Sequence, residues 1–318
     1  MRLLYVLLFF GSLLLGFAQP TQLGFDSIPE PEIEEPVWTI NNEAGFDISQ
    51  VAYINWNIGG NNSIAGLLKS RFERNYKKGM FSFMNELVMR YGINKQEGRE
   101  SRKTDDIFQI VSTVGYKMDE DSKWYYSSKS SFNTQFTNGY SYPNTHTPIS
   151  QAFAPAYFFF GFGADYIDHD EQLRFYLSPL TAKSTMVFNQ RLADQGAFGV
   201  KGATYDEFGE RITKGKLHRT EIGILVTNNW KTKVYDNIFY ENKISLFTDY
   251  FNKFGNIDID WQILFEFIIN KYVKASINAH LIYDHDVKTK REIDGKTVTF
   301  GPKLQIKESI GIGLTYNW

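Results

Sequence analysis

Apolar and polar residues alternate along most of this chain, and the alternation is clearest in residues 304–318. One parity of that segment carries its apolar side chains, namely Leu304, Ile306, Ile310, Ile312, Leu314, Tyr316 and Trp318. Successive side chains of a strand point to opposite faces, so the pattern predicts a strand with one apolar face. Such a final strand, ending on an aromatic residue, is typical of a strand that closes a bacterial outer-membrane barrel. The last strand of a soluble sandwich is the alternative.

Eleven further segments are predicted to be strands, and hardly any stretch has a helical period. Together with 304–318 they are 46–56, 63–76, 79–91, 103–116, 123–136, 156–167, 171–188, 219–231, 236–250, 257–269 and 271–283. Most exceed the mean soluble strand of about 5–6 residues and match the ~9–11 residues that cross a bilayer. We therefore predict an all-β fold, an antiparallel transmembrane β-barrel of about twelve strands, with ten or fourteen as the alternatives. Segments 46–56 and 171–188, which Pro179 interrupts, are the weakest of the set.

The connections between these segments sort into short and long ones. Every second connection is short: 77–78, 117–122, 168–170, 232–235 and residue 270. Four of the six others are long: 92–102, 137–155, 189–218 and 284–303. Outer-membrane barrels have short periplasmic turns and longer extracellular loops, so the pattern predicts both termini in the periplasm. A soluble sandwich has no reason to sort its loops in this way.

The N-terminal region has the features of an exported protein. Residues 1–18 combine Arg2, an apolar run and a small-residue cleavage site, which predicts a cleaved signal peptide. Residues 19–43 contain four prolines and several glutamates and predict a flexible acidic periplasmic leader. The barrel domain is then 44–318. Outer-membrane lipid is the expected environment, and the barrel assembly machinery is the expected partner of Ile310, Ile312, Leu314, Tyr316 and Trp318 as a C-terminal assembly signal.

Composition narrows the remaining function classes. The net charge of −2 gives no electrostatic case for nucleic-acid binding. Hydrophobic residues make up 42% and aromatic residues 16% of the 318 residues, which suits strands that are apolar on one face only. There is no cysteine, so the chain forms no disulfide, thiolate metal site or lipid-bearing cysteine. We predict no cofactor and a monomeric barrel.

Charged residues occupy the polar parity of the predicted strands and supply the expected lumen. They are Lys69, Arg71, Glu73, Glu86, Arg90, Asp105, Lys129, Asp165, Arg174, Glu221, Glu241, Lys243, Asp258, Asp260, Glu266, Lys274 and Lys307. Ten of them form the candidate lumen network: Arg71, Glu86, Arg90, Lys129, Glu241, Lys243, Asp260, Glu266, Lys274 and Lys307. Because desolvated charges must pair, one hypothesis is a salt-bridge network that fills the interior. The other is a narrow polar pathway.

Two features of the sequence could be sites of specific chemistry. His280 shares a parity with Ser276, but that parity also holds Lys274 and points inward, so a lumen histidine is favoured over a catalytic one. Alternate carboxylates in residues 283–286 could hold Ca²⁺, although a solvated loop fits better. No catalytic, cofactor or metal residue is assigned.

Three further features raise structural questions. Loop 189–218 is the best candidate to fold over or into the pore. The dipeptide Asp294-Gly295 predicts a hairpin between the last two strands, beyond the membrane. Glu308 lies on the apolar parity of the last strand, where a position near the outer rim or a β-bulge would explain it.

The run QVAYINWNIGGNNS, from Gln50 to Ser63, resembles the opening of domain-of-unknown-function family 3078, an uncharacterised family of Bacteroidetes proteins. An ordered series of shorter matches follows, with NYKKG at 75–79, KTDD at 103–106, WYY at 124–126, TQF at 134–136, APAY at 154–157, SPLT at 178–181, GAFG at 196–199 and IYD at 282–284. Asn61 departs from the acidic residue that often stands at its place in the family. The resemblance implies an outer-membrane barrel and brings no activity and no functional residues.

These observations predict an integral outer-membrane barrel whose specific activity is open. A narrow channel for small polar solutes, or a structural envelope component, is favoured, because no nucleophile and base stand out. A lipid-modifying enzyme and an export or assembly partner in an envelope complex are the alternatives.

Overall fold

The computed structural model describes residues 37–53, 61–168, 172–252, 254–293 and 296–318. The predicted signal peptide and most of the predicted leader lie outside these residues. The barrel strands are β1 (Val37–Val51), β2 (Ser63–Lys78), β3 (Phe81–Gln96), β4 (Arg102–Lys117), β5 (Trp124–Thr134), β8 (Ala156–Ile167), β9 (Leu173–Met186), β12 (His218–Tyr235), β13 (Ile238–Asp249), β14 (Asp258–Ile268), β15 (Val273–Tyr283) and β18 (Gln305–Asn317).

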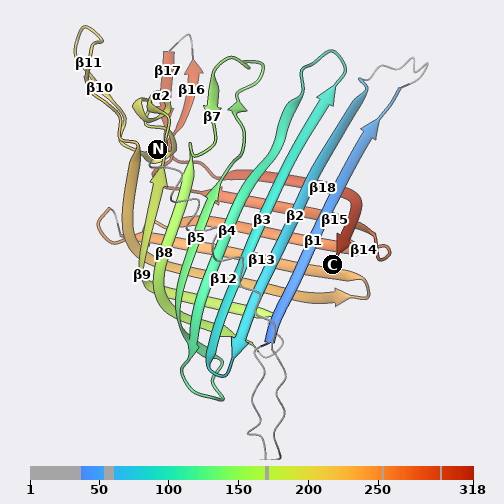
Figure 1. Cartoon of the computed structure of the whole chain (residues 1–318). Helices are drawn as coiled ribbons and strands as arrows, with labels where there is room; N and C mark the ends of the chain where they lie inside the picture. Colours follow the sequence, from blue (N-terminus) through green and yellow to red (C-terminus); the bar gives the residue numbers. More distant parts are fainter. Residues whose placement is uncertain (1–36, 54–60, 169–171, 253, 294–295) are drawn as a thin grey trace, which may run out of the picture. The chain divides into compact units, whose positions relative to one another are not determined.

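Twelve strands close into one antiparallel barrel, as predicted (Figure 1). Each strand pairs with its neighbours in the chain, and β1 pairs with β18 to complete the ring. The pairing of Glu43 with Asn317 places the start of β1 and the end of β18 at the same end of the barrel. Connections 79–80, 118–123, 168–172, 236–237 and 269–272 share that end, and the other end carries all the longer ones. Short and long connections alternate as predicted except between β3 and β4, where residues 97–101 replace the long connection predicted at 92–102, because β3 extends to Gln96.

Short elements gather in the connections at the opposite end (Figure 1). They are β6 (Gly139–Tyr140) with β7 (Pro148–Ser150), the helix α2 (Gln190–Asp194), the 3-10 turn η2 (Ala197–Gly199), β10 (Thr204–Tyr205) with β11 (Arg211–Thr213), and β16 (Thr289–Ile293) with β17 (Lys296–Phe300). The last pair forms a separate two-stranded sheet, so the hairpin predicted in this connection is present. Its two turn residues lie outside the described residues.

The first strand corrects the predicted domain boundary. It begins at Val37, and not at 46, and it pairs with β2 along its whole length to Val51. Residues 37–43 therefore belong to the barrel and not to the leader, which was assigned 19–43. Glutamate and the nearby prolines suggested a flexible segment, but a long neighbouring strand satisfies this backbone with a full ladder of hydrogen bonds.

A β-bulge interrupts β9 and explains why the predicted strand 171–188 shows no regular alternation. In β9, Ser178 and Thr181 lie opposite Leu225 and Gly223 of β12, so three steps along β9 match two steps along β12. Pro179 lies within the bulge, where its missing N–H removes no hydrogen bond of the ladder. The extra residue reverses the parity, and the inward side chains change from Tyr176 and Ser178 to Thr181 and Lys183.

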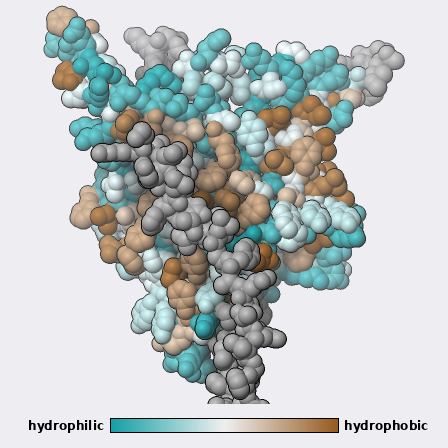
Figure 2. Space-filling view, in the orientation of Figure 1, coloured by the Kyte–Doolittle hydropathy of each residue, from teal (hydrophilic) through white to brown (hydrophobic). Residues whose placement is uncertain are grey.

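The outer surface of the strands is apolar. Outward side chains that are more than a third exposed include Leu68, Tyr116, Tyr126, Phe162, Leu180, Ile277, Ile310, Ile312 and Leu314. On the face shown in Figure 2, hydrophobic residues gather over the strands and hydrophilic ones over the connections at the upper end. No helix in the described part of the chain is long and apolar enough to cross a membrane.

Candidate functional site

The interior of the barrel carries a dense network of ion pairs. Arg71 on β2 lies 2.9 Å from Glu73, 2.7 Å from Glu86 and 3.7 Å from Glu241. Lys243 lies 3.6 Å from Glu86 and 3.1 Å from Glu241. Four predicted lumen residues therefore meet in one cluster, which Glu73 extends. We call it the central network.

The central network joins opposite walls. Glu86 is on β3 and Lys243 is on β13, and five strands separate β3 from β13 in either direction around the ring. Lys231 on β12 adds contacts of 4.0 Å to Glu73 and 3.5 Å to Glu241. A twelve-stranded barrel lies between small barrels with filled interiors and large ones with open channels. Here the charged side chains bridge the lumen at this level.

Apolar side chains fill another part of the interior. Tyr176, Leu225 and Phe247 are each at most 5% exposed and pack with Phe159. The rings of Phe159 on β8 and Phe247 on β13 meet edge to face, with centroids 6.1 Å apart. Lys129 lies beside this group, 5.2 Å from the Tyr176 ring centroid, and its ammonium donates to Thr227 Oγ1 at 3.1 Å. Lys129 thus packs beside the apolar group and forms no ion pair within 4.0 Å with the central network among the described residues.

The other predicted lumen residues form separate pairs. Arg90 and Lys307 converge on Asp105, at 3.3 Å and 3.0 Å, although three strands lie between β18 and β4. Lys274 contacts Glu43 at 2.8 Å and Glu266 at 3.8 Å. Asp260 lies 2.9 Å from His280. The ten residues of the candidate network are thus divided among several clusters.

A second ion-pair network lies around Lys183 and Arg219, toward the end of the barrel that carries the long connections. The alternation of apolar and polar residues did not predict it. Lys183 lies 2.5 Å from Asp258, 3.5 Å from Asp284 and 3.7 Å from Glu221. Arg219 lies 2.8 Å from Glu221 and also pairs with Asp286, at 2.9 Å. Glu221 and Asp258 were on the predicted polar parity, whereas the bulge at Pro179 moved Lys183 onto the interior face. Asp284 and Asp286 follow the end of β15 and carried no strand signal. We call this group the rim network.

A polar cavity of about 610 Å³ occupies the interior beside these clusters. Arg71, Glu86, Glu241 and Lys243 of the central network line it, and so do charged residues of the wall. The cavity wall also includes Lys69, Arg90, Asp105, Glu266, His280 and Lys307. The central network, which bridges the lumen, therefore forms part of the wall of this cavity.

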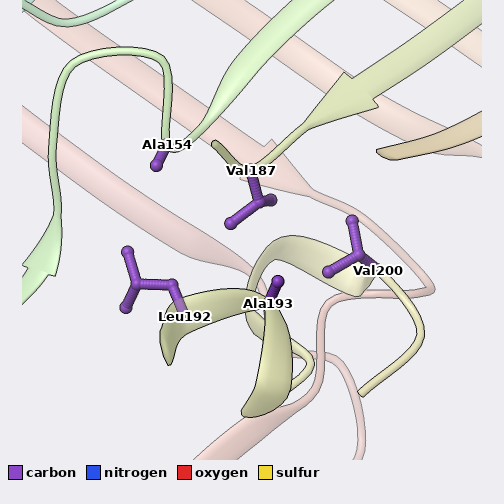
Figure 3. Close-up of a cluster of buried hydrophobic side chains, with 5 residues drawn as sticks. All are labelled: Ala154, Val187, Leu192, Ala193 and Val200. Carbon is purple, nitrogen blue, oxygen red and sulfur yellow. The ribbon is translucent and has the colours of Figure 1, made fainter. Parts of the chain in front are cut away.

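The long connection between β9 and β12 packs as a compact cap. Leu192 and Ala193 of α2 are buried together with Val187, Val200 and Ala154, the last from the connection between β5 and β8 (Figure 3). The Asn189 side chain caps α2 by accepting from the Leu192 N–H at 3.1 Å. Arg219 of the rim network donates to the Gly199 carbonyl at 3.1 Å. The connection predicted to fold over the pore thus contacts the interior charges through Arg219.

Asp194 ties the β10–β11 hairpin to this cap. Its carboxylate accepts from the Gly215 N–H and from Gln190 Nε2, both at 2.7 Å, and pairs with Arg211 at 2.6 Å. These hydrogen bonds, the one from Gly215 foremost, hold the pKa of Asp194 below its ordinary value.

We expect the hairpin to loosen in acid. A depressed folded-state pKa stabilises the fold above the ordinary pKa of about 3.9, and the stabilisation is lost as pH falls through the folded value. An acid-active protease should therefore cut residues 201–214 faster at about pH 2 than at about pH 4.5, relative to cuts elsewhere. Asp194→Asn should be cut fast at both pH values and Glu207→Gln should behave as wild type. If Asp194→Asn showed the same ratio of cutting at the two pH values as the wild type, the role of Asp194 in holding the hairpin would be contradicted.

The metal and catalytic groups considered in the sequence analysis are not brought together among the described residues. They include no group of three or more His, Cys, Asp or Glu side chains arranged to hold a metal ion. Asp284 and Asp286, once weighed as Ca²⁺ ligands, are paired with Lys183 and Arg219. Ser276 lies four residues from His280 in β15, which separates the two by about 13 Å. Hydrogen bonding between them is ruled out by that separation.

Residues 48–140 match the family model described as Protein of unknown function (DUF3078). No curated protein sequence matches the chain. Among solved structures, the chain is similar to the translocator domain of autotransporter NalP from Neisseria meningitidis, at 9% identity and a TM-score of 0.35, over 89% of this chain and 90% of that one. It is also similar to the COG4313 outer membrane channel from Pseudomonas putida F1, at 10% identity and a TM-score of 0.38, over 92% and 99%. The closed barrel is established by this chain's own strand pairing and not by these likenesses.

Proposed function

We propose that this protein is an integral outer-membrane β-barrel that forms a narrow, gated pathway for small polar solutes. It would be exported through the signal peptide at residues 1–18, with both ends of the barrel sequence in the periplasm. The central network that joins opposite walls is the observation that carries the proposal.

The distribution of polarity supports a membrane location. The barrel exposes large apolar side chains on its outside and places ionisable groups inside, which is the reverse of a soluble protein. The ring of paired strands satisfies most of the backbone polar groups of the wall without water. A hydrocarbon environment would cover the apolar outer surface.

The charged residues of the interior support a polar pathway for solutes better than a salt-bridge network that only fills the barrel. Buried ion pairs are no more stabilising than well-packed apolar residues, so a barrel that needed only a filled interior would gain nothing from the central network. This barrel already uses apolar packing around Tyr176, and it keeps charges where the 610 Å³ cavity meets the central network. Paired charges of both signs suit small polar solutes and give no preference for large ions of one sign.

The orientation can be tested by labelling, because the chain has no cysteine of its own. A cysteine at Phe208, which is 92% exposed in the β10–β11 connection, should react with a membrane-impermeant maleimide in intact cells. A cysteine at Glu120, which is exposed in the β4–β5 connection, should react only after the outer membrane is permeabilised. The opposite pattern would reverse the proposed orientation.

Conductance in planar bilayers tests the gated pathway. We expect the wild-type barrel to be mostly closed, and the double variant Glu241→Gln/Lys243→Gln to conduct more, because it removes the contacts of β13 with Arg71 and Glu86 without changing net charge. The pair Asp165–Arg174, 3.1 Å apart on neighbouring strands and outside the cavity lining, offers a matched control. Asp165→Asn/Arg174→Gln should conduct as wild type. Folded barrels without current in all three proteins would favour a structural envelope component.

A further inference from the structure

The barrel is closed incompletely at one place among its described strands. The β1–β18 ladder runs only from Glu43–Asn317 to Asp47–Gly313. Beyond that point β1 continues to Val51 while paired with β2, and β18 extends back to Gln305 while paired with β15. Residues 48–51 and 305–312 therefore form strand edges without a ladder between them. We call this region the seam opening.

Asp47 marks the point where the ladder ends. Its carboxylate lies against Gly313 and Gly311, where a Cβ on Gly313 would collide with Asp47 and with the Phe46 carbonyl. Lys69 of the neighbouring strand holds the same carboxylate at 3.1 Å. The close approach requires glycine at 313. The ion pair joins β1 to β2 and holds the Asp47 carboxylate against Gly313 of β18, where the β1–β18 ladder ends.

The polar cavity extends into the seam opening. Its lining includes Ile48 and Ser49 of β1, and residues 307–311 of β18. Glu308 and Ile310 belong to the outward parity of β18, because Lys307 points inward to Asp105. Residues of both parities on β18 therefore line the cavity where the ladder to β1 is missing. The interior cavity thus reaches the unpaired edges of the two strands.

An apolar groove lies directly below the opening on the outer wall. It has a volume of about 240 Å³ and is lined by Phe46, Ile48, Val273, Ile312, Gly313 and Leu314. Ile48 lines both the groove and the polar cavity. A single molecule with an apolar chain and a polar head could therefore occupy the two spaces at once.

Glu308 indicates the charge of that head. It is exposed on an otherwise apolar face, and its ladder partner on β15 is Ala279. The β15–β18 register runs without a shift, so no bulge turns Glu308 inward. Asp47 and Asp105 have Lys69 and Lys307 as partners, whereas Glu308 has no ion-pair partner within 4.0 Å among the described residues. A lipid-facing carboxylate is costly away from the interface, and an amine would offset that cost.

We propose that the seam opening takes up an amphiphile with an amine headgroup from the surrounding bilayer. The headgroup lies at Glu308 and extends into the polar cavity, and the acyl chain lies in the groove of Phe46, Ile312 and Leu314. In the orientation of the proposed function, on which this inference rests, Glu308 is nearer the cell surface than Leu314. The head then lies above the chain, as for a lipid of the outer leaflet.

Photocrosslinking in vesicles tests the proposal. The purified barrel is folded into vesicles that contain either phosphatidylethanolamine or phosphatidylglycerol with a photoreactive diazirine on the chain, and labelled peptides are mapped by mass spectrometry. We expect labelling of β1 residues 46–48 and β18 residues 312–314 to be several-fold stronger with phosphatidylethanolamine. Glu308→Gln should abolish the preference, and Glu120→Gln, an acidic site in a distant turn, should keep it.

Sealing the seam provides a second test. Continuing the register would pair Val51 with Ser309, both on the inward parity, so oxidation of the variant Val51→Cys/Ser309→Cys would trap the two strands in a closed seam when they approach. Oxidation should remove the strong labelling and reduction should restore it. Equal labelling by both lipids along the whole outer wall, or labelling unchanged in Glu308→Gln, would overturn the proposal. Either result leaves the conductance and orientation experiments unaffected, so the two proposals fail separately.

Discussion

Replacing Lys183 by methionine should destabilise the barrel by about 3–5 kcal/mol, the cost of removing one partner from a buried ion pair. The side chain of Lys183 is 5% exposed, and its ammonium lies within 4.0 Å of Asp258, Asp284 and Glu221. Methionine fills similar space but leaves three carboxylates without that cation. Urea unfolding in lipid vesicles, followed by the fluorescence of the six tryptophans, measures the loss.

The comparison variant is Lys233→Met. Lys233 pairs with Asp236 at 2.8 Å, but the two side chains are 54% and 85% exposed, and exposed pairs contribute less than about 1 kcal/mol. Adding Asp258→Asn to Lys183→Met should recover part of the stability, because it removes one uncompensated charge. A loss in Lys183→Met no larger than in Lys233→Met would show that the rim network carries no unusual share of the stability.

Deleting residues 314–318 should prevent the barrel from closing. Four of the five residue pairs between β1 and β18 involve these residues, and only Asp47–Gly313 remains after the deletion. We expect the loss of the compact, heat-resistant form on gels, both in outer-membrane fractions and after folding of the purified chain into vesicles. The second measurement needs no assembly machinery, so it separates ring closure from recognition of a signal.

Trp318→Ala is the matched control for the deletion. It removes the ring contacts with Phe72 and Tyr316, at centroid distances of 6.2 Å and 5.7 Å, but keeps the backbone bond from Trp318 N–H to the Asn42 carbonyl. The variant should fold into vesicles nearly as well as wild type. Its reduced assembly in cells would support the predicted role of the C-terminal residues as an assembly signal. Normal folding of the deletion variant would contradict closure through these pairs.

Much of the architecture could be predicted because a strand that separates an apolar from a polar side has a period of two. Residues 156–167 were predicted with their observed bounds, and β15 and β18 to within two residues. The predictions were weaker where the local alternation of apolar and polar residues does not match the pairing between strands. In residues 37–43 the apolar side chains of Val37, Trp38 and Ile40 are followed by three polar residues without alternation, and the strand depends on its partner β2.

The candidate site was predicted only in part. Arg71, Glu86, Glu241 and Lys243 were chosen as inward-facing residues, but their meeting depends on which strands lie opposite one another. Lys183 was missed because one extra residue near Pro179 reverses the parity of β9. Period counting cannot detect such a reversal when the residues on both sides of the bulge are of mixed polarity.

The sequence by itself predicted a barrel of about twelve strands, their alternating inward and outward faces, and most of the sorting of short and long connections, because each follows from local periodicity and turn chemistry. It also singled out Glu308 as an outward charge. The tertiary structure alone decided that the lumen is bridged by ion pairs, that Lys183 joins the rim, and that β1 separates from β18 above Asp47. These properties depend on distances between residues far apart in the chain, and only the closed ring brings those residues together.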